Sequence, residues 1–148
     1  NCSLDECVRK SLRKFASEFI GRKLRLQYTE LSGSMVTDEK WFCFVLEQLL
    51  SNALKYTKEG SVSVYKTEDN RLVIEDTGMG IAPEDLPRIF EKGYTGYNGR
   101  SDHKATGLGL YLCKRICDNL GMKITAESVV GQGTRIYLDL NQYELQVE

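Results

Sequence analysis

Four side chains in the segment 47–56 have the types and the spacing of a site for a metal-bound phosphate. Apolar residues recur around them at helical spacing. At about 3.6 residues per turn, Gln48, Asn52, Lys55 and Tyr56 therefore fall near one face of a helix. The amide oxygens suit Mg²⁺, Lys55 suits phosphate oxygens and Tyr56 offers a flat aromatic surface. Taken alone, the segment is better explained as a polar helix face that meets solvent.

A second candidate site, Asp76-Thr-Gly-Met-Gly-Ile81, directly follows a predicted strand. An ionised carboxylate only accepts hydrogen bonds, so Asp76 suits an exocyclic amine such as that of adenine. Gly78 and Gly80 allow the backbone to fold tightly over a ligand, and Ile81 supplies an apolar wall. A glycine-rich turn with an exposed Asp explains the segment equally well on its own.

Two more glycine-rich segments lie further along the chain. Thr106-Gly107-Leu108-Gly109-Leu110 opens a predicted helix, where free backbone N–H groups and the helix dipole favour an anion such as a triphosphate. Gly131-Gln-Gly-Thr134 precedes the last predicted strand and is fully explained as a hairpin turn. Each pattern is weak evidence by itself, so the functional argument depends on their joint order.

The elements that must position these segments follow from hydrophobic periodicity. Helices are expected over 4–20, 38–56 and 108–120, with Thr37 as the cap of the second, and a helical turn over 84–90. Strands are expected over 23–30, around 62–64, and over 72–74, 123–128 and 134–140, with turns at 32–34, 68–70 and 131–133. This order predicts an α+β fold, a two-layer sandwich in which three helices cover one face of a mixed sheet.

Length and composition fit one domain. The 148 residues are 41% hydrophobic, which is enough for a core. A formal charge of -1 argues against nucleic acid as a partner. No stretch approaches the roughly 20 apolar residues that span a bilayer. The chain does not begin with Met, so we expect it to be part of a longer protein.

The cysteines give no sign of a metal site at this stage. They are Cys2, Cys7, Cys43, Cys113 and Cys117, none of them in a C-x-x-C pair, and His103 is the only His. The odd number and irregular spacing favour reduced thiols in a cytoplasm, and a zinc site is not expected. We interpret them as small apolar side chains on helices and His103 as an ordinary loop residue.

Jointly and in this order, the four segments resemble the N box and the three glycine-rich boxes of the Bergerat-type ATPase fold. That fold is shared by gyrase, Hsp90, histidine kinases and MutL-type proteins. Arg88-Ile-Phe90 resembles the F box of histidine kinases and lies where that family keeps it. The resemblance extends to about Leu140 and implies a single catalytic ATP-binding domain over 1–148, with an ATP lid over about 91–106.

The resemblance implies a role for each matching position. Asn52 would coordinate Mg²⁺ with help from Gln48, Lys55 would contact phosphate and Tyr56 would cover the nucleotide. Asp76 would accept a hydrogen bond from the adenine amine. The other nucleotide-binding positions would be Gly78, Gly80, Ile81, Thr106, Gly107, Leu108, Gly109, Leu110 and Thr134.

The predicted lid points to a narrower subgroup. The segment from Gly93 to Arg100 resembles the lid of small Gram-positive kinases that respond to cell-envelope antibiotics, and Trp41 just ahead of the N box fits that subgroup. Arg100 and Lys104 would assist phosphoryl transfer from the lid, while the other catalytic groups would lie outside this chain.

One position separates a kinase from a hydrolase. Histidine kinases typically carry Asn four residues before the Mg²⁺-binding Asn, whereas gyrase-like and Hsp90-like enzymes carry a Glu base there. Here the residue is Gln48, whose neutral amide cannot accept a proton. Glu47 is rotated about 100° away on the helix. The kinase is therefore favoured; the alternatives are a hydrolytic ATPase and a nucleotide-binding module without chemistry.

For a histidine kinase, the resemblance also implies partners. The phosphate acceptor would be a His on a separate dimerisation domain of the same protein, which would pass the phosphate to a response regulator. This domain would be cytoplasmic and without direct membrane contact. The whole protein would be a homodimer in the bacterial plasma membrane.

Overall fold

Two long helices form where periodicity and capping residues predict them. In the computed structural model, which describes residues 2–94 and 109–141, α1 spans Leu4–Gly21 and α2 spans Glu39–Tyr56. The Ser3 hydroxyl caps α1 by accepting a hydrogen bond from the Glu6 amide at 3.3 Å. The cap of α2 is Asp38 and not the expected Thr37, because the Asp38 carboxylate accepts from the Trp41 amide at 3.4 Å.

Five strands form one mixed sheet in the spatial order β2-β4-β5-β7-β6. β2 pairs in parallel with β4, and the other neighbours are antiparallel, as the prediction of a mixed sheet requires. β5 is the central strand and ends at Asp76. The bounds are β2 (Arg25–Tyr28), β4 (Ser61–Lys66), β5 (Arg71–Asp76), β6 (Lys123–Val129) and β7 (Gly133–Asp139).

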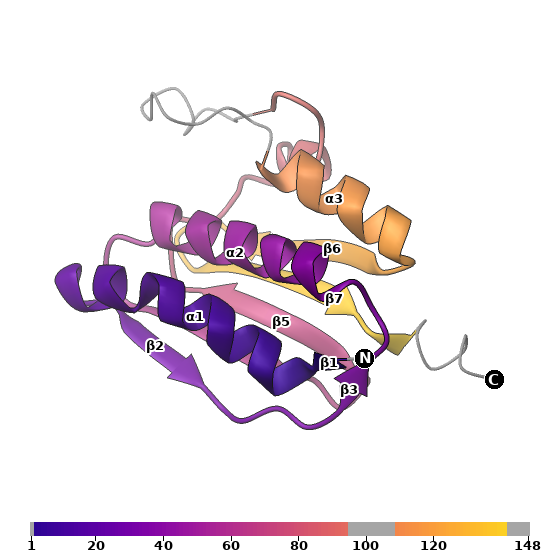
Figure 1. Cartoon of the computed structure of the whole chain (residues 1–148). Coiled ribbons are helices and arrows are strands. Elements are labelled where there is room, and N and C mark those ends of the chain that lie inside the picture. The colour runs from indigo at the N-terminus through magenta and orange to yellow at the C-terminus, as the bar shows by residue number, and fades with distance from the viewer. Residues whose placement is uncertain (1, 95–108, 142–148) are drawn as a thin grey trace.

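Helices α1, α2 and α3 (Gly109–Leu120) pack on one face of this sheet, which confirms the predicted sandwich (Figure 1). α2 lies between α1 and α3 and contacts both. Phe42, Leu46 and Leu50 on its apolar face are each at most 2% exposed. Because this packing buries the broad apolar face of α2, its polar side chains lie on the rest of the helix surface.

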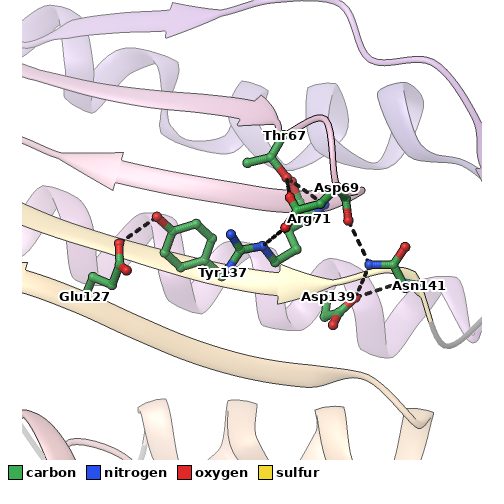
Figure 2. A network of polar contacts seen from close by, with 7 residues as sticks. All are labelled: Thr67, Asp69, Arg71, Glu127, Tyr137, Asp139 and Asn141. Atoms are coloured by element: carbon green, nitrogen blue, oxygen red, sulfur yellow. Dashed lines mark hydrogen bonds and ion pairs between the residues drawn. The ribbon is translucent and has the colours of Figure 1, made fainter.

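Polar and aromatic side chains cover the opposite face of the sheet. Tyr137 of β7 is buried there because the Arg71 guanidinium lies over its ring, 4.3 Å from the centroid. Figure 2 shows how Arg71 pairs with Asp69 at 3.1 Å and how the Asn141 side-chain amide donates to the Asp69 carbonyl at 2.8 Å. These contacts tie the turn before β5 to the end of β7, and they support the register that brings Asp76 opposite Thr134.

A second, two-stranded sheet was not predicted. β1 (Cys2–Ser3) pairs antiparallel with β3 (Ser34–Met35), so Ser34, expected in a turn, lies in a strand. Gly33 retains the turn with a φ of 102°, and its carbonyl accepts from the Leu4 amide at 3.2 Å. This small sheet holds the start of α1 near the start of α2.

In residues 77–94, the described part of the segment between β5 and α3, the chain forms one short helix. The expected helical turn over 84–90 is the 3₁₀ helix η1 (Leu86–Arg88). Ile89 directly after it is buried, and Phe90 packs against the core. Among the residues that the structure describes, none of the helices has the length and apolar character that a bilayer crossing requires.

Candidate functional site

The site is built around the Asp76 carboxylate at the end of β5. Its side chain lies between the helices and the sheet, and the residue is only 8% exposed. The Gly78 amide donates to Oδ1 at 2.9 Å, and the Thr134 amide also donates to this carboxylate. Burial nevertheless outweighs these hydrogen bonds and raises the pKa of Asp76 to about 6. A carboxylate that accepts two backbone hydrogen bonds still has lone pairs that can accept a hydrogen bond from an N–H group of a ligand.

A buried hydroxyl lies beside this carboxylate without a good partner. Thr57 directly follows α2, is 0% exposed and lies near enough to Asp76 to lower its pKa. No hydrogen bond of normal geometry reaches its Oγ from the described residues. Buried polar groups are normally satisfied, so the Thr57 hydroxyl beside this acid is a candidate group for contact with a ligand.

The loop after Asp76 is fastened on two sides. The Met79 amide donates to the Tyr56 carbonyl at 3.1 Å, which joins the loop to the end of α2. The Gly131 amide donates to the Met79 carbonyl at 2.8 Å, and the Ile81 amide donates to the Ser128 hydroxyl at 2.7 Å. The loop therefore connects α2 to the β6–β7 hairpin and fixes both around the acid.

Three glycines permit close backbone approach here. A Cβ on Gly78 would lie 2.3 Å from the Tyr56 carbonyl oxygen, and one on Gly80 would lie 2.3 Å from that of Val129. A Cβ on Gly133 would lie 1.9 Å from the Asp76 carbonyl oxygen. Gly133 also has a φ of 130°, so it does more than close the hairpin turn that the sequence predicted.

The polar residues of α2 that the sequence predicts to bind a ligand lie in the C-terminal half of the helix. Gln48, Asn52, Lys55 and Tyr56 are all partly exposed, as expected for residues available to a ligand. The Lys55 ammonium lies over the Tyr56 ring at 5.5 Å from its centroid. A Cβ on Gly109, the first residue of α3, would lie 3.1 Å from the Gln48 amide oxygen. The start of α3 is thus beside the amide face of α2.

Glu47, the only acidic neighbour of Gln48 on the helix, faces α1. Its carboxylate forms an ion pair with the Lys14 ammonium at 2.9 Å. The helical rotation expected from the sequence therefore places this acid away from Gln48. Glu47 is not available as a base on the face that carries Asn52.

Several predicted positions lie outside the described residues. They are Thr106, Gly107, Leu108, Arg100, Lys104, His103 and all but the first residues of the lid. Of the phosphate-binding segment, Gly109 and Leu110 are described, and Leu110 packs against the core. Trp41 is 47% exposed and meets Phe44 edge to face at 6.0 Å.

Two site residues were missed by sequence reasoning. Thr57 is the first residue after α2, and its position next to the predicted ligand face was the available signal. Ser128 ends the predicted strand 123–128; its hydroxyl shares a hydrogen bond with that of Thr134 at 2.8 Å. Only the β6–β7 pairing reveals this contact, because a lone serine at a strand end has no distinctive pattern.

Comparison with known proteins agrees with this geometry. The family model for histidine kinase-, DNA gyrase B- and HSP90-like ATPases matches residues 37–144. The chain belongs to this ATPase family.

Sequence relatives narrow the comparison. The chain is 45% identical over 123 residues to the sensor protein BceS of Halalkalibacterium halodurans, covering 80% of this chain and 35% of BceS. It is 37% identical over 115 residues to the sensor histidine kinase GraS of Staphylococcus epidermidis, covering 76% of this chain and 33% of GraS. Such sensor kinases of Gram-positive bacteria are the subgroup that the lid sequence resembles. The chain spans about a third of the length of these relatives.

Solved structures show the same fold. The mycobacterial sensor histidine kinase MprB superposes with a TM-score of 0.79 at 21% identity, covering 93% of this chain and 94% of that one. Full-length ShkA in complex with AMPPNP superposes with a TM-score of 0.77 at 22% identity, covering 93% of this chain and 29% of that one.

Replacing Gly133 by Ala should disrupt the site, because the new methyl group would collide with the Asp76 carbonyl. We expect a loss of about 2–4 kcal/mol in the free energy of unfolding. Gly131→Ala is the matched control, since Gly131 has a similar positive φ of 82° but nothing within 4 Å of its Cβ position. That variant should lose about 1 kcal/mol. Urea denaturation measures both, and equal losses would contradict the proposed close approach.

Proposed function

We propose that this chain is the Mg-ATP-binding catalytic domain of a sensor histidine kinase. It would donate the γ-phosphate to a histidine on a dimerisation domain outside the chain. The observation that carries the proposal is the buried Asp76 carboxylate beside the unpaired hydroxyl of Thr57, the residue that directly follows α2. The relatives named sensor protein BceS and sensor histidine kinase GraS support the same proposed function.

At the base end, the ionised Asp76 carboxylate accepts a hydrogen bond from the adenine amine. The Thr57 hydroxyl donates to a ring nitrogen or to a water that bridges to it, which satisfies a group that otherwise lacks a partner. Thr134 and Ser128 hold the other side of the acid through their shared hydrogen bond. Gly78, Gly80 and Ile81 line the base pocket.

At the phosphate end, Lys55 contacts phosphate oxygens and Tyr56 covers the nucleotide. The side-chain oxygens of Asn52 and Gln48 fit Mg²⁺, because both are neutral oxygen donors on an accessible helix face. Bound there, Mg²⁺ would neutralise charge on the phosphates during transfer. Backbone amides of the segment 106–110 hold the remaining phosphate charge.

The α2 geometry favours a kinase over a hydrolase. Water attack requires a base close to the γ-phosphate, and the residue in that position is the Gln48 amide. Glu47 is committed to Lys14 on another side of the helix. Phosphoryl transfer to an external histidine needs alignment and charge neutralisation, which the proposed groups supply.

The proposed partners are those of a sensor kinase. They are ATP, the dimerisation and phosphotransfer domain of the same protein, and a cognate response regulator. The whole protein would be a homodimer anchored in the bacterial plasma membrane, with this domain on the cytoplasmic side. Arg100 and Lys104 would assist transfer from the lid over 91–106.

Asp76→Asn should abolish discrimination between ATP and GTP and weaken ATP binding about 10- to 100-fold, because it removes a charged acceptor. In the wild type, protonation of Asp76 competes with nucleotide, so affinity should fall about tenfold for each pH unit below about 6. The variant should lose this dependence. Calorimetric titration at several pH values measures both effects.

Glu68→Gln is the matched control, because Glu68 is an exposed acid in the turn before β5. It should bind ATP like the wild type at every pH. An Asp76→Asn protein that still selects adenine would contradict the assigned role.

Asn52→Ala should reduce the effect of Mg²⁺ on ATP affinity. We expect the gain on adding Mg²⁺ to shrink about tenfold, while binding in the presence of a chelator stays within about twofold of the wild type. Ser51→Ala changes the neighbouring exposed residue and should keep the full gain. An unchanged gain in Asn52→Ala would remove this residue from the metal site.

Joining the chain to the dimerisation domain of its own protein should yield acid-labile phosphate on one histidine when ATP is added. The chain alone should show no steady hydrolysis, since Gln48 offers no base. Replacing the acceptor histidine by Gln should abolish labelling without changing ATP affinity. Steady, histidine-independent ATP turnover by the chain would instead favour the hydrolytic alternative.

A further inference from the structure

A cluster of potential metal ligands lies away from the nucleotide site. Cys2 in β1, Cys7 in α1 and Glu39 at the start of α2 each offer one ligand atom, and the three atoms lie within 4.8 Å of one another. Cys2 is 7% exposed and Cys7 is 2% exposed. The pairing of β1 with β3 brings these elements together, which is why spacing along the chain gave no sign of the cluster.

Cys43 is positioned to add a fourth ligand. It follows Glu39 by one helical turn, so both residues lie on the same side of α2. Burial and, after it, the neighbouring Cys2 and Cys43 thiols raise the pKa of the Cys7 thiol, so the three sulfur atoms lie close together. All three sulfur atoms belong to reduced cysteines.

The spacing of these atoms is close to that of a tetrahedral metal site. With Zn–S bonds of about 2.3 Å and Zn–O bonds of about 2.1 Å, the ligand atoms of such a site lie roughly 3.5–3.8 Å apart. The ligand atoms of Cys2, Cys7 and Glu39 are within 4.8 Å of one another, so side-chain rotations bring these three onto one cation. The Glu39 side chain is about half exposed and is able to move.

The pocket beside the cluster and the charges around it are also compatible with a cation bound by thiolates. Cys7 and Glu39 line a surface pocket of about 370 Å³ together with Glu6, Arg9, Lys10 and Arg13. Two thiolates and a carboxylate exceed the charge of a divalent cation by one negative charge, and a third thiolate adds another. The nearby basic groups offset this excess; the Lys10 ammonium already lies 3.9 Å from the Glu39 carboxylate.

We propose that Cys2, Cys7, Glu39 and Cys43 form a binding site for a thiophilic divalent cation of the zinc class. Sulfur ligands select such a cation over Mg²⁺, which prefers oxygen. Glu39 precedes Asn52 by thirteen residues on α2, a rise of about 20 Å, so the site is separate from the nucleotide pocket. A bound cation would join β1, α1 and α2 and raise the stability of the domain.

The test uses the chain reduced with a phosphine, freed of metal and titrated with Zn²⁺ against a chromophoric chelator. We expect one equivalent to bind tightly enough to compete, together with an increase in Tm. Co²⁺ in place of Zn²⁺ should show thiolate-to-metal charge-transfer absorption. Failure to withdraw Zn²⁺ from the chelator, or a Co²⁺ spectrum without thiolate bands, would overturn the proposal.

Variants locate the site. Cys7→Ser should weaken Zn²⁺ binding about 100-fold and Glu39→Gln about tenfold. Cys117→Ser removes a buried thiol of α3, and His103→Gln removes the only His; both should bind Zn²⁺ like the wild type. Glu39→Gln changes a half-exposed residue in a first helical turn, so it remains informative if Cys7→Ser does not fold. Wild-type affinity in Glu39→Gln and Cys7→Ser, or an equal loss in Cys117→Ser, would assign the metal elsewhere.

Discussion

Burial of the Asp76 carboxylate at the end of the central strand is the constraint around which the site is organised. Burying an acid is unfavourable unless hydrogen bonds or a ligand compensate, and the raised pKa expresses this cost. The surrounding backbone approaches closely enough that Gly78 and Gly133 cannot carry a side chain without collision. Such tight packing around a partly satisfied acid is expected where the protein presents that acid to a ligand.

Helix α2 links this acid to the rest of the site. Its apolar residues pack against α1, α3 and the sheet. Its polar residues therefore lie on the side of the helix that these contacts leave open. Helical rotation then assigns adjacent residues to different partners. Glu47 pairs with Lys14, whereas Gln48 lies beside Gly109. In the proposed site, the side chain that faces the nucleotide is therefore the Gln48 amide and not the Glu47 carboxylate.

Much of the fold could be predicted from the sequence, because the long elements carry strong periodicity and clear caps. α1, α2 and the strands β4–β7 lie close to their expected ranges. The two-residue strands β1 and β3 could not be predicted, since so short a segment has no period and depends on tertiary pairing. The cap of α2 was misplaced by one residue because Thr37 and Asp38 are both good capping residues.

The candidate site was predictable to the extent that it lies in contiguous motifs. Asp76, Asn52 and the glycines belong to such motifs, but Thr57 and Ser128 act through contacts with distant segments. The cluster of Cys2, Cys7 and Glu39 was still harder to predict from the sequence, because its members come from three different elements. Pairings between distant segments are decided by packing, and spacing along one chain does not report them.

In the proposed site, Asp76 and Asn52 hold opposite ends of one nucleotide. The most direct measurement is a crystal structure of this chain with a non-hydrolysable ATP analogue and Mg²⁺. We expect the adenine amine within hydrogen-bond distance of the Asp76 carboxylate and the metal on the Asn52 side-chain oxygen. A nucleotide bound elsewhere, or these two side chains turned away from the same ligand, would contradict this arrangement.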